Sequence, residues 1–294
     1  TGWHGNKALG FLLECCAVEK RVTLSAPDMI DQVGEALLKD CVVITPKHIM
    51  TEDFDDIPAG VVPAVDDPMY KSVLADNALC RHAIGVYTYA SIGYPHLVMP
   101  NSVLGKNAAF PHCRTLKGLR HMAMHLRANK RSASYCTYGV VGLERSEDAE
   151  LIAPHGAVRP AYMHSFVDAN LKSYSRTGGV AMLACGAIHT VSQNQHLASP
   201  CSHTSEVVAA STFFNHLVPT IGSLQELGIM QGVACPYYLD SNTTVFVAND
   251  DKGVKKSVWL IRRTAVLRDG VIGGYIMPLH LSEKDNCADP FTKY

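Results

Sequence analysis

The sequence predicts a chain of two parts, in which a mainly helical region precedes a domain that mixes strands and helices (α+β or α/β). Three observations favour this class. The chain has 294 residues, of which 47% are hydrophobic and 18% charged, enough for two domains with buried cores. Residues 68–131 have mostly helical patterning, interrupted between Gly93 and Pro100. After residue 160 the pattern changes to short apolar runs that are typical of strands.

The first part opens with expected strands and one well-marked helix. Apolar stretches within residues 5–24 flank the polar residues 19–21, which favours a β-hairpin. Ser25 is expected to cap a helix that has Pro27 in its first turn and Asp28 in the capping-box position. Residues 51–67 are acidic and contain Pro and Gly, as loops do.

The segment 115–129 is the most basic helix candidate. His121 and His125 are four residues apart, but the residues between them include no Glu, so a zinc enzyme built on them with Cys113 is disfavoured. The cations of this segment suit either a phosphate backbone or a solvated helix face. Ten cysteines without a CxxC motif favour reduced thiols over disulfides or zinc.

The second part is expected to contain five strands and their helices. The polar residues 143–160 suggest a boundary, so we predict domains at 1–145 and 161–294 with a linker at 146–160. Strands are expected at 162–167, 179–185, 187–192, 235–239 and 271–279. Helices are expected at 204–217, 257–268 and 286–293. Pro219 is expected to kink or split the first of these helices before Gly228 closes it, and Gly270 to end the second.

Four acidic residues have contexts that suit a divalent-cation site. Asp168 and Asp240 follow apolar, strand-like runs, Glu206 lies near the start of an expected helix, and Asp289 lies near the C-terminus. A carboxylate beside buried strands is costly unless a partner or cation compensates it. Mg²⁺ prefers oxygen ligands, and two such ions about 3.5–4 Å apart can drive phosphodiester hydrolysis. For any one acid, a surface position or a helix-dipole contact is the commoner explanation.

These acids lie in blocks that resemble the ribonuclease H domain of copia-type retrotransposon polyproteins. The blocks are Ser165-Phe-Val-Asp168-Ala169 with Thr177 and Gly179, then Gln195, Ser199, Ser202 and Glu206, then Tyr238-Leu-Asp240, and finally Ala288-Asp289-Pro-Phe291-Thr292-Lys293. Residues 5–131 resemble the distal reverse transcriptase, through Gly10–Glu14, Arg81–Gly85 and Pro95–Leu97. The sequence departs from the family pattern at Thr190, Asn194, Thr204 and Ser257, none of which is one of the four acids.

The resemblance implies a ribonuclease H-like mixed five-stranded sheet with flanking helices, preceded by a mainly helical thumb and connection region. It implies that Asp168, Glu206, Asp240 and Asp289 bind two Mg²⁺ ions, with Mn²⁺ as an alternative, and cut the RNA strand of RNA–DNA hybrids during reverse transcription. The implied partners are the hybrid and the polymerase palm of the same polyprotein, with no membrane. The implied location is the cytoplasm, in a virus-like particle, or the nucleus. The polymerase aspartates would precede Thr1, so we expect no DNA synthesis from this chain alone.

Nucleic-acid contacts are expected from local clusters, because the formal net charge is only −1. The candidates are Gln195, Lys252, Lys255, Lys256, Arg262 and Arg263; for the cations a solvated helix face is an equal alternative. The alternative function is a non-catalytic retroelement remnant that binds nucleic acid or protein. Convergence of Asp168, Glu206 and Asp240 is the geometric requirement for the enzyme.

Overall fold

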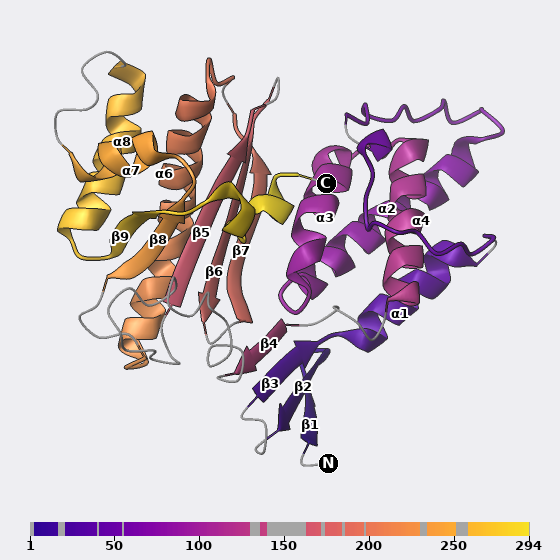
Figure 1. Cartoon of the computed structure of the whole chain (residues 1–294). Coiled ribbons are helices and arrows are strands. Elements are labelled where there is room, and N and C mark those ends of the chain that lie inside the picture. Colours follow the sequence, from indigo (N-terminus) through magenta and orange to yellow (C-terminus); the bar gives the residue numbers. More distant parts are fainter. Residues whose placement is uncertain are drawn as a thin grey trace. The chain divides into compact units, whose positions relative to one another are not determined.

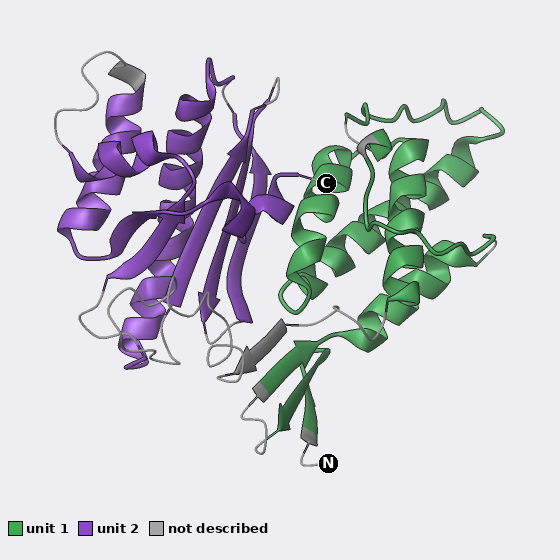
Figure 2. Cartoon of the chain, in the orientation of Figure 1, with its two compact units in different colours: residues 1–16, 22–136, 294 green, residues 17–21, 137–293 purple. Residues whose placement is uncertain are grey.

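The computed structural model describes residues 3–16, 21–39, 41–54, 56–129, 136–139, 163–171, 174–183, 186–196, 198–229, 234–250 and 258–293. The chain divides into two compact units (Figure 2). Unit 1 comprises Thr1–Cys16, Val22–Cys136 and Tyr294, and unit 2 comprises Ala17–Arg21 and Thr137–Lys293. The predicted linker at 146–160 lies outside the described residues.

A small sheet opens the chain, with the order β1 (Trp3–Ala8), β2 (Phe11–Cys16), β3 (Arg21–Ser25) and β4 (Cys136–Gly139). Strands β2 and β3 flank the polar residues where the hairpin was predicted, and they are neighbours in the sheet. Strand β1 was not predicted. It pairs antiparallel with β2 through a turn at Leu9 and Gly10, whose φ angles of 52° and 81° suit the twist of a two-residue hairpin.

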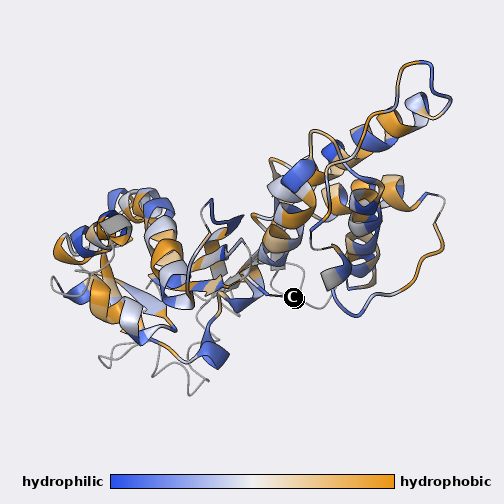
Figure 3. Cartoon of the chain, turned by 90° about the horizontal axis from the view of Figure 1, so that it is seen from above, coloured by the Kyte–Doolittle hydropathy of each residue, from blue (hydrophilic) through white to orange (hydrophobic). Residues whose placement is uncertain are grey.

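Helices make up the rest of unit 1: α1 (Pro27–Leu38), α2 (Tyr70–Ala90), α3 (Val98–Leu104) and α4 (Cys113–Ala128), with short 3₁₀ turns η1 (Glu52–Phe54), η2 (Pro95–Leu97) and η3 (Gly105–Asn107). Their apolar sides form one core around Leu37, Tyr87 and Leu119, and the helices are banded in apolar and polar residues (Figure 3). Pro27 opens α1 as predicted. The predicted Ser25 cap is wrong, because Ser25 ends β3 and Ala26 takes the cap position without a side-chain bond.

Unit 2 is built on a five-stranded mixed sheet of order β7-β6-β5-β8-β9 (Figure 1). The strands are β5 (Met163–Asn170), β6 (Arg176–Leu183), β7 (Gly186–Asn194), β8 (Cys235–Leu239) and β9 (Ile276–His280). Strands β5, β6 and β7 pair antiparallel, whereas β5, β8 and β9 pair parallel. With α6 (Ser202–Glu226), α7 (Asn242–Asn249) and α8 (Val258–Ile272), this is the predicted ribonuclease H-like sheet with flanking helices.

Helix α6 is the core helix of unit 2. It packs against β5 and β6, and it buries Phe213, Leu217 and Ile221. Gly179 on β6 leaves the space that the Phe213 ring occupies. Among the described helices, α6 alone is long and apolar enough to cross a membrane. An 18-residue window of it has a mean hydropathy of 1.2, but half of that window is buried. Its burial against the sheet explains this apolar composition.

Several predicted boundaries of unit 2 are wrong for identifiable reasons. Helix α6 continues past Pro219, where both Pro219 and Asn215 face solvent, so the carbonyl left without its helical donor can meet water. It ends at Glu226, and Gly228, with a φ of 71°, closes it as predicted. Helix α8 continues through Gly270, where an added Cβ would lie 2.6 Å from the Phe214 ring, and the chain turns at Gly274. Two 3₁₀ turns, η4 (Glu283–Asp285) and η5 (Asp289–Phe291), replace the predicted terminal helix.

Candidate metal centre

Two neighbouring parallel strands and one helix carry three of the predicted acids. Asp168 lies near the end of β5, and Asp240 directly follows β8. Val167 and Leu239 are paired in register, so the acids that follow them leave the sheet at the same edge. Glu206 lies near the N-terminal end of α6. This helix begins at Ser202, so Glu206 lies beyond the first turn, where a contact with the helix dipole explains less of its presence.

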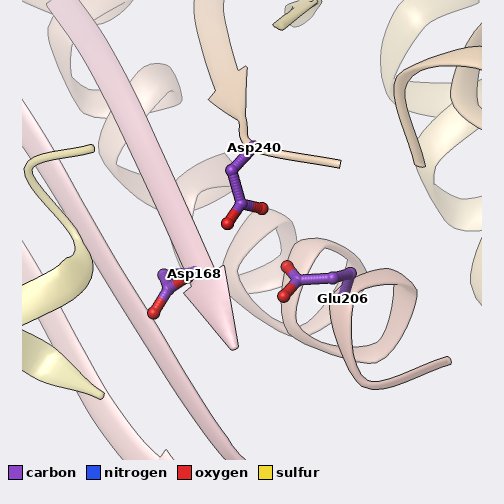
Figure 4. Close-up of side chains that lie close together, drawn as sticks. All are labelled: Asp168, Glu206 and Asp240. Atoms are coloured by element: carbon purple, nitrogen blue, oxygen red, sulfur yellow. The ribbon is translucent and has the colours of Figure 1, made fainter. Parts of the chain in front are cut away.

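The three carboxylates converge at this edge of the sheet. Asp168, Glu206 and Asp240, here called the acid triad, each offer one oxygen, and these oxygens all lie within 4.8 Å of one another. Asp168 is 1% exposed and Glu206 is 7% exposed, whereas Asp240 is half-buried. Figure 4 shows the Asp240 and Glu206 carboxylates pointing toward one another, with Asp168 beside them. The convergence that an enzyme requires is therefore present.

The donor atoms of the triad fit a hard divalent cation. Glu206 Oε2 and Asp240 Oδ1 are both buried, and neither has a hydrogen-bond partner among the described residues. Buried polar atoms are normally paired, so two carboxylate oxygens without a hydrogen-bond partner at one point fit a cation as their partner. All the donors are carboxylate oxygens, which suits Mg²⁺ or Mn²⁺ better than zinc.

Mutual repulsion and burial raise the proton affinity of the triad. Burial raises the pKa of Glu206 to about 9, and the charges of Asp240 and Asp168 add to the rise. Burial also raises the pKa of Asp168 to about 6, against the opposing effects of Thr292 and Lys293. The pKa of Asp240 is raised by burial and by the charge of Glu283. Protons therefore compete with a cation for these carboxylates, and a bound cation would take their place.

The fourth predicted acid, Asp289, lies beside the triad and outside it. Its charge raises the pKa of Asp168, so it is within electrostatic reach. Its Oδ1, however, accepts a hydrogen bond of 2.5 Å from Lys293 Nζ, and the same ammonium bonds Glu283 Oε1 at 2.8 Å. The structure therefore brings three of the four predicted acids together, and it pairs the fourth with a lysine.

The segment 286–293, here called the C-terminal turn, packs against β5 and β6. The Thr292 hydroxyl donates a hydrogen bond to Asp168 Oδ2. Asn286 Nδ2 donates to the Val167 carbonyl at 2.9 Å, and Asn170 Nδ2 donates to the Thr292 carbonyl at 2.7 Å. The sequence indicated the Asp289–Lys293 block but not these hydrogen bonds. The presence of the block was the only feature of the sequence that pointed to them.

Gln195 and the Arg residues of α8 differ in accessibility. Gln195 is 5% exposed, and its Nε2 donates to the Ser205 carbonyl at 2.9 Å, one residue before Glu206. It therefore holds the start of α6 in place. Arg262 is exposed, and Arg263 is half-buried with Nη1 3.5 Å from Thr212 Oγ1. Lys252, Lys255 and Lys256 lie outside the described residues.

The basic helix α4 makes hydrogen bonds within unit 1. His121 Nε2 lies 2.9 Å from the His48 carbonyl oxygen, and His125 Nδ1 lies 3.2 Å from that of Pro46. Arg120 Nε donates to the Leu37 carbonyl at 3.0 Å. Both imidazoles therefore contact backbone oxygens of the segment that precedes η1. Lys117 and Arg127 remain exposed on this helix.

Comparisons with known proteins give structural likenesses only. No protein-family model matches the sequence, and no curated protein matches it. One similar solved structure is an N-terminal RNase H domain from Mycobacterium tuberculosis, solved as a fusion with maltose-binding protein; it is 12% identical, with a TM-score of 0.35, over 45% of this chain and 91% of that chain. A second is LC11-RNase H1, isolated from compost by a metagenomic approach, at 14% identity and a TM-score of 0.34 over 45% of this chain and 92% of that one. LC11-RNase H1 in complex with an RNA/DNA hybrid is 15% identical, with a TM-score of 0.32, over 44% of this chain and 92% of that chain.

Proposed function

We propose that unit 2 is a ribonuclease H that uses divalent cations to cut the RNA strand of RNA–DNA hybrids. One observation carries the proposal. Three carboxylates from β5, β8 and α6 converge within 4.8 Å, and two of their buried oxygens have no partner among the described residues. The ribonuclease H-like order of the five strands supports the same assignment.

The acid triad would hold two Mg²⁺ or Mn²⁺ ions, with Asp289 as a further ligand. When bound, the cations supply positive charge at the scissile phosphate and lower the pKa of a water molecule. The protein fixes the positions of the ligands. Thr292 orients the Asp168 carboxylate, and Gln195 ties the start of α6, which carries Glu206, to the sheet. Burial excludes water from Asp168 and Glu206, which strengthens their attraction for a cation.

The proposal also covers the substrate, an RNA–DNA hybrid, and the origin of the chain in a retroelement. A hybrid would be recognised through its phosphates and the 2′-hydroxyls of its minor groove. Arg262 and Arg263 on α8, with Lys252, Lys255 and Lys256 before it, are the proposed phosphate contacts. The four sequence blocks that end at Lys293 support a copia-type retrotransposon origin, with the polymerase palm as partner and a virus-like particle in the cytoplasm, or the nucleus, as the location.

A cleavage assay tests the proposal. The full chain is incubated with a labelled RNA–DNA hybrid, with and without Mg²⁺, beside single-stranded RNA, duplex RNA and duplex DNA. We expect Mg²⁺-dependent cutting of the hybrid RNA, lost in Asp240→Asn and kept in Asp285→Asn, which removes an exposed acid outside the triad. Equal cutting by the parent and Asp240→Asn, or no cutting by the parent, contradicts the assignment.

A non-catalytic interaction module is the second candidate. It is favoured by the ion pair of Lys293 with Asp289, in which a side-chain cation neutralises part of the acid set. This candidate predicts that the parent and Asp240→Asn bind the hybrid equally and that neither cuts it. Binding measured beside cleavage in the same samples separates the two functions.

A further inference from the structure

The ammonium group of Lys293 interacts with several acids around the metal centre. Lys293 Nζ lies 2.5 Å from Asp289 Oδ1 and 2.8 Å from Glu283 Oε1. Its charge also opposes the rise that burial causes in the pKa of each member of the acid triad. Burial works to lower the pKa of Lys293 itself, but its two hydrogen bonds and the charge of Asp168 hold that pKa above the usual range. Lys293 is therefore a resident cation among the acids Asp168, Glu206, Asp240, Glu283 and Asp289.

The backbone beside this ammonium is anchored. Thr292, the preceding residue, donates to Asp168 through its hydroxyl and accepts from Asn170 through its carbonyl. Asn286 fixes the start of the same turn to the Val167 carbonyl. The lysine side chain, by contrast, is 40% exposed and has four rotatable bonds. The ammonium can therefore leave its partners while its Cα stays at the centre.

We propose that Lys293 is a tethered counter-ion that competes with divalent cations, holding Asp289 outside the acid triad until the cations bind and then releasing it as a fourth ligand. This inference rests on the metal centre of the proposed function. It explains why Asp289, alone of the four predicted acids, does not converge with the others. Lys293 is a positioning residue in this account, because it acts on the ligand set through Asp289.

The expected effect of the Lys293 ammonium on divalent-cation affinity is moderate. A cation that enters the triad is repelled by the ammonium and must also displace it from Asp289. Because the pair is partly exposed, with Asp289 at 37% and Lys293 at 40%, solvent screens much of this interaction. Removing the ammonium is therefore expected to tighten divalent-cation binding about threefold to tenfold.

Mn²⁺ binding to the full chain, measured by electron paramagnetic resonance without substrate, tests the inference. Lys293→Met is expected to bind Mn²⁺ about threefold to tenfold more tightly than the parent, and Lys293→Arg as weakly as the parent. Lys284→Met is the matched control. It removes an exposed lysine of η4 that has no ion pair in the described part of the chain. Asp289→Asn, added to Lys293→Met, is expected to reverse the gain in affinity.

The outcomes separate this inference from the proposed function. Equal or weaker Mn²⁺ binding by Lys293→Met overturns the inference, as does a Lys293→Arg protein that gains affinity like Lys293→Met. A gain that survives Asp289→Asn overturns the release of Asp289. Should Lys293→Met fail to fold, Lys293→Gln replaces it under the same criteria. Asp240→Asn that binds Mn²⁺ like the parent overturns the metal centre and the inference together, whereas tight binding without hybrid cleavage overturns only the proposed function.

Discussion

Thr292 and Asp168 are joined by a hydrogen bond from the threonine hydroxyl to carboxylate oxygen Oδ2, although the residues lie 124 positions apart in the chain. Both residues are 1% exposed. Asp168 thereby gains a donor that orients one oxygen and leaves the other available to the triad. The hydroxyl also opposes the rise that burial causes in the pKa of Asp168.

Replacing Thr292 by Val keeps the shape of the side chain and removes this donor. The Asp168 carboxylate then loses a buried, charge-assisted bond, and we expect a loss of about 1–3 kcal/mol in the free energy of unfolding. Mn²⁺ affinity is expected to fall as well, because the ligand oxygen is no longer oriented. Chemical denaturation above neutral pH and Mn²⁺ titration measure the two effects.

Thr115→Val is the matched control for this change. Thr115 is also 1% exposed, but it belongs to α4 in unit 1, whereas the acid triad belongs to unit 2. Its replacement is expected to leave Mn²⁺ affinity unchanged. Equal losses of Mn²⁺ affinity in the two variants would show that Thr292 acts through general stability alone.

Glu206 makes the stability of the metal-free protein depend on pH. The ordinary pKa of this carboxyl is 4.5, and burial raises it to about 9. The folded protein therefore binds the proton more tightly than the unfolded chain. This contribution to stability is complete below pH 4.5 and is lost as the pH rises toward 9. Asp168 acts in the same direction between pH 3.8 and about 6.

Glu206→Gln is expected to remove most of this pH dependence. Above neutral pH the metal-free variant should be at least about 1 kcal/mol more stable than the parent, since it has no buried charge to accommodate. It should also lose the stabilisation that Mn²⁺ gives the parent. Thermal unfolding across pH, with and without Mn²⁺, measures both effects. Glu226→Gln, at the exposed end of α6, should behave like the parent; the same gain there would refute the assignment to burial.

Local chemistry explains which elements could be predicted. Strand β8 was predicted at its observed bounds, because an apolar run with two tyrosines is followed at once by an acid. Helix α7 was missed because Thr, Val and Asn, which favour helices weakly, make up six of its eight residues. Its start is instead set by the Ser241 side chain, which accepts a bond from the Thr244 amide at 3.2 Å.

Contacts distant in sequence explain what could not be predicted. Gly270 was expected to end α8, but it lies within that helix. Its lack of a side chain leaves room for the Phe214 ring of α6. The four acids were found through their sequence blocks, but the bond between Thr292 and Asp168 depends on how the C-terminal turn packs on the sheet. No local pattern contains that information. Likewise, an i, i+4 spacing is compatible with the pair of Asp289 and Lys293, yet it does not predict that this pair forms beside the triad.

Arg262 tests the proposed phosphate contact on α8. Its side chain is exposed, and replacement by Ala should weaken hybrid binding about equally for all sequences. The slope of log affinity against log salt should become shallower by about 0.9 for each phosphate contact that is lost. Fluorescence anisotropy in the Asp240→Asn background measures binding without cutting. Lys71→Ala on α2 removes an exposed cation elsewhere and should leave the slope unchanged; equal changes in both variants would indicate general charge attraction.

Gly178 provides the space in which the C-terminal turn meets the sheet. It pairs across the strands with Asp168, so both residues face the same side of the sheet. A Cβ at this position would lie 2.5 Å from Thr292 Cγ2 and 3.1 Å from the Ala288 carbonyl oxygen. Gly178→Ala should therefore displace the turn, with a loss of about 1–3 kcal/mol in stability. Because the displaced turn carries Thr292, Mn²⁺ affinity should fall as it does in Thr292→Val.

Gly222→Ala is the control that separates this crowding from the general effect of adding a methyl group. Gly222 lies within α6 and has nothing within 4 Å of an added Cβ, so the change should stabilise the protein by about 0.5–1 kcal/mol without altering Mn²⁺ binding. Combining Gly178→Ala with Thr292→Val should cost less Mn²⁺ affinity than the sum of the two changes, since both act through one hydrogen bond. Strict additivity would mean that Gly178 and Thr292 affect the triad by separate routes.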